Sequence, residues 1–174
     1  MKKTRQGDRE IPAPQSPWDE IVPGLWMGGH YWTDPSGGLR RVVVGAEFEL
    51  VVSLFTRSGH GPRPDIEHLV AEIPDGPLSP VQLEAVQAAA LRTAQAVKDG
   101  CTTLVRCHSG YNRSGLVVAQ ALIELGRGAE SAVELVRRRR SPFALNNETF
   151  TDYLGTGLDV AGLLAGLEDP TLGT

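Results

Sequence analysis

Four residues with chemically useful side chains, Cys107, Gly110, Arg113 and Ser114, stand close together in the stretch VRCHSGYNRSG (residues 105–115). A β-branched run (residues 102–106) precedes the stretch and an apolar run (residues 114–125) follows it. This order predicts a buried strand, a loop and a helix. Because ligands of α/β sheets bind where strands end and helices begin, the four residues are predicted to share one ligand site.

The site would suit an anion. The positive end of the helix and its unpaired N–H groups attract negative charge, and Gly110 permits the positive φ that turns successive N–H groups inward. The same field would stabilise a Cys107 thiolate. Arg113 can donate two hydrogen bonds to a dianionic phosphate, and Ser114 can donate one to the sulfur. The alternative is a buried core cysteine with unrelated neighbours. It is disfavoured because glycine, arginine and serine fall where an anion-binding loop needs them.

At these residues the sequence resembles the cysteine-dependent protein phosphatases, in particular the compact dual-specificity group, whose C-x-x-G-x-x-R-S signature it meets in full. Residues 22–28 (VPGLWMG) are similar to the family's opening strand. Asn147 and Phe150 are similar to the start of its late helix, where the asparagine braces the phosphate loop. The resemblance spans about residues 18 to 155. It implies a protein-tyrosine or dual-specificity phosphatase that forms a phosphocysteine on Cys107 and uses neither a metal nor another cofactor.

Such a mechanism needs a proton donor for the leaving oxygen, which the family keeps on a mobile loop before the signature. Asp75 in the turn IPDGP (residues 73–77) fits this role best, with Asp65 and Glu72 in reserve. The competing interpretation is an ordinary turn aspartate. Because an aspartic acid is mostly ionised at neutral pH, an acidic optimum is expected.

The loop residues are expected to bind the substrate through side chains or N–H groups; they are His108, Ser109, Gly110, Tyr111, Asn112 and Arg113. The chain departs from the family at Arg106, where histidine is usual. A buried arginine needs a partner, so either an ion pair with Glu72 or Glu148, or support of the thiolate, is expected.

Other functions of the same cysteine stay open. A catalytically weak or inactive phospho-binding module would keep the loop without turnover, and a non-protein phosphomonoester is an alternative substrate. Arsenate reduction is less well matched because no resolving thiol is evident, and sulfur transfer because sulfurtransferases tend to use shorter anion loops. Since Ser109, Tyr111 and Asn112 are neutral, a single phosphomonoester is expected rather than a polyphosphorylated ligand.

The composition of the chain excludes several classes of binding partner. The chain of 174 residues has 17 Lys+Arg against 21 Asp+Glu, which disfavours general nucleic-acid binding. Its two cysteines are too few for a disulfide scaffold or a four-cysteine zinc site, and Cys101 is expected to be a bystander. No signal peptide or spanning run is evident. The expected protein is cytoplasmic, binds no nucleic acid or membrane, and acts on a phosphorylated protein or small phosphomonoester.

The elements around the site indicate one α/β catalytic domain over residues 18–167, between flexible tails at 1–17 and 168–174. Strands are expected at 41–44, 49–55, 67–73 and 102–106, and a further short strand after the turn that begins at residue 21. Helices are expected after Ser79 to Asp99 and at 114–125, 130–140 and 147–167, the last as one helix or a pair. Residues 29–38 and 56–65 are expected as loops. The predicted fold is a mostly parallel sheet of four to five strands with helices on both faces.

Overall fold

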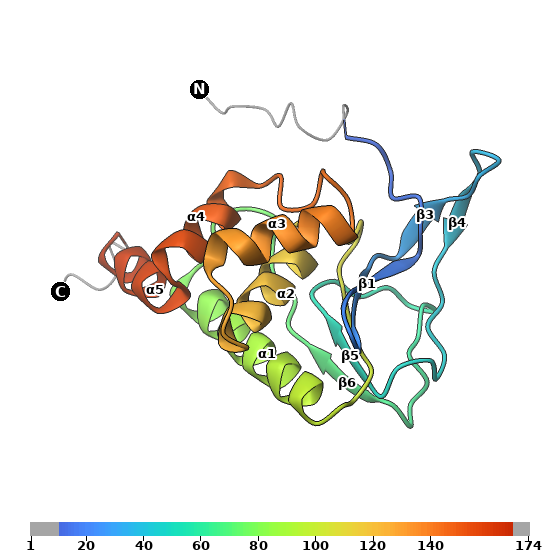
Figure 1. The fold of residues 1–174 in the computed structure, drawn as a ribbon, viewed down its shortest axis with the longest axis horizontal. Coiled ribbons are helices and arrows are strands. Elements are labelled where there is room, and N and C mark those ends of the chain that lie inside the picture. The colour runs from blue at the N-terminus through green and yellow to red at the C-terminus, as the bar shows by residue number, and fades with distance from the viewer. Residues whose placement is uncertain (1–10, 169–174) are drawn as a thin grey trace.

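A computed structural model describes residues 11–168 of the chain. Its centre is a five-stranded sheet with the order β1-β2-β7-β5-β6, in which only the edge strand β1 runs antiparallel to its neighbour. The strands are β1 (Trp18–Val22), β2 (Leu25–Gly28), β5 (Leu50–Ser53), β6 (Glu67–Val70) and β7 (Thr103–Arg106). The predicted α/β class with a mostly parallel sheet is confirmed (Figure 1).

The interior strands β5 and β7 are buried along their whole length, as their near-continuous β-branched and apolar runs predict. Their side chains alternate between two separate clusters. Val52 and Val105 belong to the main core, whereas Val51 and Leu104 belong to a smaller core. Because β7 has a neighbour on either side, its carboxyl end holds the loop that follows it firmly in place.

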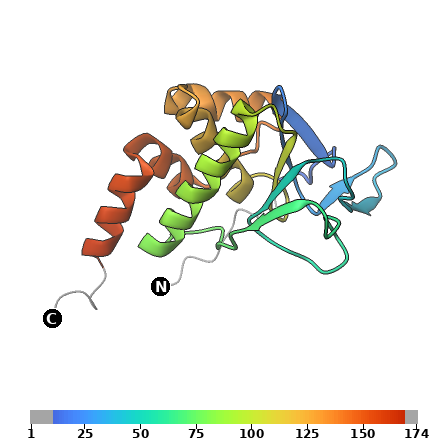
Figure 2. The ribbon, with the colours of Figure 1, turned by 90° about the horizontal axis from the view of Figure 1, so that it is seen from below.

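The helices lie on one face of the sheet, so the prediction of helices on both faces is wrong (Figure 2). All the helical core residues belong to the main core. The smaller core is built instead from loop residues Val42, Val44 and Phe48, and three tryptophans pack against it. The helices are α1 (Pro80–Lys98), α2 (Arg113–Glu124), α3 (Ala129–Arg139), α4 (Glu148–Thr156) and α5 (Leu158–Leu167).

Local signals set the helix ends. Ser79 caps α1 and exchanges two hydrogen bonds with Gln82, as predicted, and Gly100 follows the helix with φ +75°. The last helical region is a pair, because Gly157 at φ +100° separates α4 from α5. None of the helices in residues 11–168 is long and apolar enough to cross a membrane.

Two segments differ from the predicted elements. A small hairpin of β3 (Tyr31–Thr33) and β4 (Leu39–Arg41) occupies the region predicted as a loop, and the strand predicted at 41–44 ends at Arg41. Residues 11–17 lie against the domain rather than apart from it. Pro14 is buried and its carbonyl accepts from the Thr33 N–H at 2.7 Å. The rest of the predicted tails, residues 1–10 and 169–174, lies outside the described residues.

Candidate active site

Cys107 lies directly after β7, and the loop that it begins ends at Arg113, the first residue of α2. The side chain is 2% exposed. Its Sγ lies 3.2 Å from the Oγ of Ser114, which is itself fully buried. The hydroxyl is therefore in position to donate to a thiolate, the contact that the sequence predicts for these two residues.

The loop presents its N–H groups inward because its carbonyl groups are bound from outside. The His108 carbonyl accepts from the His30 N–H, and the Tyr111 carbonyl accepts from the Leu145 N–H. Between them, the Ser109 and Gly110 carbonyls accept from Nη2 and Nε of Arg140. In a trans peptide the C=O and the following N–H point in opposite directions. The N–H groups of residues 109–112 therefore face the opposite side, and among residues 11–168 they donate to no other group. Such a row of N–H groups is an anion nest.

Close backbone packing shapes this loop. Gly110 has φ +73°, the left-handed conformation predicted for it, and a Cβ there would lie 2.5 Å from the Gly28 carbonyl oxygen. A Cβ on Gly29 would lie 2.7 Å from the His108 carbonyl oxygen. The end of β2 and the loop are thus in direct backbone contact, so that a side chain fits at neither glycine.

Arg113 extends from the first turn of α2 into the same cavity. Its guanidinium carbon lies 5.3 Å from the centre of the Phe55 ring, and Nη1 donates to the Ile73 carbonyl at 3.4 Å. Its Nε is buried without a hydrogen-bond partner among the described residues. Buried polar groups are normally paired, so this donor is suited to an oxyanion in the loop.

Asp75 lies in the wall of the cavity, on the turn that precedes α1. Its carboxylate accepts from Asn147 Nδ2 at 2.7 Å and from Asn112 Nδ2 at 3.1 Å. Both amides orient this carboxylate toward the loop. The reserve acids lie elsewhere: Asp65 pairs with Arg63, Glu72 accepts from Thr56, and neither lines the cavity.

The Asn147 side chain was expected to brace the phosphate loop, but it contacts Asp75 instead. Its side chain caps α4 by accepting from Thr149 N at 3.0 Å and donates to Asp75. Only its backbone N–H reaches the loop, at Asn112 Oδ1, 3.0 Å away. Asn147 thus joins the start of α4 to Asp75. The neighbouring Asn146, which sequence reasoning missed, also lines the cavity and accepts from Asn112.

The cavity has a volume of about 500 Å³ and one apolar wall. That wall comes from Leu39 and from residues that the sequence assigned to a tail and a loop: Ile11, Pro12, Ala13, Pro14 and Tyr31. The Tyr111 hydroxyl donates to the Pro12 carbonyl at 2.8 Å, and burial raises the pKa of Tyr111. No spacing pattern in the sequence indicates that residues 11–14 return to residue 111.

Arg106 is 1% exposed, and the expected ion pair with Glu72 or Glu148 does not form. Its guanidinium donates instead to Ser53 Oγ at 3.1 Å and to the carbonyls of His60 at 3.0 Å and Gly61 at 2.5 Å. Burial lowers the pKa of Arg106 to about 10. The side chain therefore anchors the 56–65 loop to the end of β7, directly before Cys107.

Two buried histidines, His30 and His60, lie close to the Arg106 guanidinium. His30 Nε2 lies 3.0 Å from the Phe55 carbonyl, so it carries a proton there, and His30 Nδ1 accepts from His60 Nδ1 at 3.0 Å. Burial, followed by the charge of Arg106, lowers the pKa of His30 to about 4. His108 packs edge-on to Phe55 with ring centres 5.3 Å apart, and burial and Arg113 lower its pKa. Because burial lowers the pKa of both His30 and His60, these two hydrogen-bonded rings are neutral at physiological pH.

Cys101 and Cys107 are both free thiols. Within residues 11–168 no three His, Cys, Asp or Glu side chains are grouped so as to hold a metal ion.

The fold of this chain, with its sheet and the loop that opens onto α2, is similar to that of solved phosphatase structures. Human DUSP28 superposes with a TM-score of 0.67 at 22% identity, over 86% of this chain and 98% of that one. A mouse protein described as a dual specificity phosphatase, complexed with zinc tungstate, gives 0.60 at 25% identity over 93% and 97%. The tyrosine phosphatase OH1 of Orf virus gives 0.57 at 17% over 83% and 87%. No family model and no curated protein sequence matches the chain. The fold is that of the compact dual-specificity phosphatases.

Proposed function

We propose that this protein is a cysteine-dependent phosphomonoester hydrolase of the protein-tyrosine or dual-specificity type. The observation that carries the proposal is the oxyanion site above Cys107. The loop with its inward N–H groups (residues 109–112) and Arg113, whose Nε has no partner within residues 11–168, borders one cavity together with a buried thiol in hydrogen-bond contact with Ser114. The structural neighbour complexed with tungstate, another tetrahedral oxyanion, supports the same assignment.

The proposed reaction has two steps, both in the loop. The Cys107 thiolate attacks phosphorus, an S–P bond forms, the ester P–O bond breaks, and Asp75 gives its proton to the leaving oxygen. Arg113 and the loop N–H groups hold the charge that develops on the equatorial oxygens. Water then attacks the phosphocysteine while Asp75 accepts its proton, which releases inorganic phosphate and the thiolate. Ser114 stabilises that leaving thiolate.

The apolar wall of the cavity supports an aryl phosphate, and phosphotyrosine in particular, as the substrate. Tyr31, Pro12 and Leu39 line the same cavity as the anion site and add apolar surface to it. A phosphoserine side chain has no ring to bury against it. The chain's net charge of −4 fits a site that binds one phosphate through local N–H groups rather than a basic, nucleic-acid-binding surface. Because the nucleophile must stay reduced, the proposal includes a cytoplasmic location.

The test is hydrolysis of p-nitrophenyl phosphate in EDTA, with Cys107→Ser as the matched variant. Wild-type turnover that vanadate inhibits and that Cys107→Ser abolishes is expected, together with faster hydrolysis of phosphotyrosine than of phosphoserine peptides. Turnover that survives in Cys107→Ser would rule out the mechanism. Tight vanadate binding by a wild-type protein without turnover would assign the chain to the phospho-binding modules instead.

A further inference from the structure

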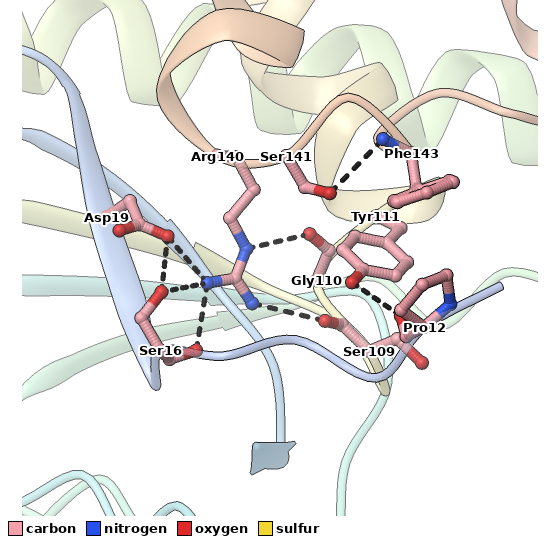
Figure 3. Close-up of polar contacts among 9 residues, drawn as sticks. All are labelled: Pro12, Ser16, Asp19, Ser109, Gly110, Tyr111, Arg140, Ser141 and Phe143. Carbon is pink, nitrogen blue, oxygen red and sulfur yellow. Dashed lines mark hydrogen bonds and ion pairs between the residues drawn. The ribbon is translucent and has the colours of Figure 1, made fainter. Parts of the chain in front are cut away.

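Arg140 is the C-cap of α3 and is 8% exposed, although it ends a run of four arginines that charge patterning would assign to the surface. Its guanidinium lies between the phosphate loop and the N-terminal segment (Figure 3). Nε donates to the Gly110 carbonyl at 3.1 Å and Nη2 to the Ser109 carbonyl at 3.2 Å. Its neighbours Arg138 and Arg139 are exposed.

The other end of the guanidinium meets the N-terminal segment. Nη1 lies 2.8 Å from Asp19 Oδ2, 3.0 Å from the Ser16 carbonyl and 3.1 Å from Ser16 Oγ. Ser16 Oγ also donates to Asp19 at 2.6 Å, so the three side chains form one closed network (Figure 3). Because Asp19 neutralises the guanidinium and Arg140 does not line the cavity, Arg140 is not a ligand for substrate charge.

What Arg140 controls is the direction of two peptide groups. The bonds to the Ser109 and Gly110 carbonyls hold those oxygens outside the loop, so the N–H groups of Gly110 and Tyr111 must point inside it. The flanking carbonyls of His108 and Tyr111 are held by backbone N–H groups. The two carbonyls between them, of Ser109 and Gly110, are held by the Arg140 side chain.

These two peptides are also the ones with most freedom to rotate, because glycine populates positive and negative φ almost equally. Gly110 stands at φ +73° between them, and a Cβ there would lie 2.7 Å from Arg140 Nη2. Because Gly110 has no side chain, the Arg140 guanidinium can approach the loop. Its hydrogen bonds then restrain the glycine backbone, which is intrinsically flexible.

We propose that Arg140 is a positioning residue that locks the peptide groups between Ser109 and Tyr111 with their N–H groups toward the oxyanion, and that joins the N-terminal wall of the cavity to this loop. The inference rests on the proposed function, since it concerns the same anion site. It assigns to Arg140 a role in preorganising that site rather than in touching the substrate.

The experiment measures anion binding and thiolate formation, neither of which requires turnover. In a Cys101→Ser background, where Cys107 is the remaining thiol, the rate of iodoacetamide alkylation is recorded against pH with and without inorganic phosphate. Arg140→Gln is expected to weaken protection by phosphate roughly tenfold or more, because two charge-assisted hydrogen bonds are lost. It should also move the alkylation midpoint to higher pH, since inward N–H groups stabilise the thiolate.

Two matched variants make the result specific. Arg139→Gln makes the same change on the exposed side of the helix, and Asp19→Asn weakens the tie to the N-terminal segment while leaving the carbonyl contacts; both are expected to bind phosphate within about twofold of wild type. Thermal unfolding checks that each variant is folded. If Arg140→Gln does not fold, Arg140→Lys is used, because one ammonium cannot reproduce the fork to both carbonyls.

A folded Arg140→Gln or Arg140→Lys protein with wild-type phosphate binding and alkylation profile would overturn the proposal. So would an Asp19→Asn protein that loses as much as Arg140→Gln, because the arginine would then act only by anchoring the segment. Failure of the proposed function looks different: wild type would bind phosphate at Cys107 and hydrolyse no phosphomonoester.

Discussion

Acidification should destabilise this protein through its buried histidine pair. In the folded chain His30 donates from Nε2 to the Phe55 carbonyl and accepts at Nδ1 from His60. A proton added to His30 would occupy Nδ1 and oppose the His60 N–H. It would also stand near the buried, positively charged Arg106, whose charge already helps to lower the pKa of His30.

The size of the effect follows from the pKa of His30, which falls from 6.5 to about 4 because the ring is buried and, second, because of Arg106. That difference corresponds to about 3 kcal/mol of unfolding free energy. The unfolded chain binds the proton first, so the contribution is fully present above pH 6.5 and is lost as the pH falls toward about 4. Burial also lowers the pKa of His60, His68 and His108, which adds to the loss with the same sign.

Urea unfolding of wild type and His30→Gln at several pH values between about 7.5 and 4.5 measures this contribution. The variant is expected to be less stable at neutral pH. Its unfolding free energy should fall less steeply near pH 5, by about 1 kcal/mol per pH unit, because one fewer proton is bound on unfolding. Carboxylates titrate in both proteins and cancel in the comparison. Parallel pH curves for the two proteins would refute the reasoning.

Three further outcomes are expected. Asp75→Asn should slow hydrolysis about a hundredfold for phenyl phosphate and much less for p-nitrophenyl phosphate, whose leaving group needs no proton; an equal loss for both would exclude the acid role. Gly110→Ala should abolish phosphate binding, because its methyl group would meet backbone 2.5 Å away at a positive φ; wild-type affinity in calorimetry would contradict the loop geometry. Arg106→Leu should lower the urea-unfolding free energy by about 3 kcal/mol or more, since two buried oxygen acceptors and a partly buried one lose their donor; a change below about 1 kcal/mol would show that water replaces the guanidinium.

The parts of the site that sequence could predict are local. The spacing of Cys107, Gly110 and Arg113 sets one loop between a strand and a helix, so the positive φ of Gly110 and the contact of Ser114 with the thiol follow from that stretch alone. The cap of α1 at Ser79 is equally local. The turn at Asp75 is local too, since it lies a few residues before that cap.

The parts that escaped prediction depend on residues distant in the chain. Apolar strands showed that both faces of the sheet are covered, but not that loop residues such as Val42 and Phe48 replace helices on one face. The burial expected for Arg106 predicts that its guanidinium has a partner. The sequence could not show that this partner is a pair of backbone carbonyls rather than a carboxylate. Charge patterning assigns Arg140 to the surface, because its acceptors in the phosphate loop, 30 and 31 residues away, are backbone carbonyls that no residue type reveals.

The N-terminal wall also bears on the order in which the protein is made. Residues 12, 16 and 19 leave the ribosome early, but their partners Tyr111 and Arg140 lie 99, 124 and 121 residues later. Synthesis proceeds from the N-terminus, and contacts over long separations close late. The sheet can therefore assemble around β7 before Arg140 is made and ties the N-terminal segment to the loop. A nascent chain that ends before α3 would carry Cys107 in a loop without the network of Ser16, Asp19 and Arg140 that later fixes it.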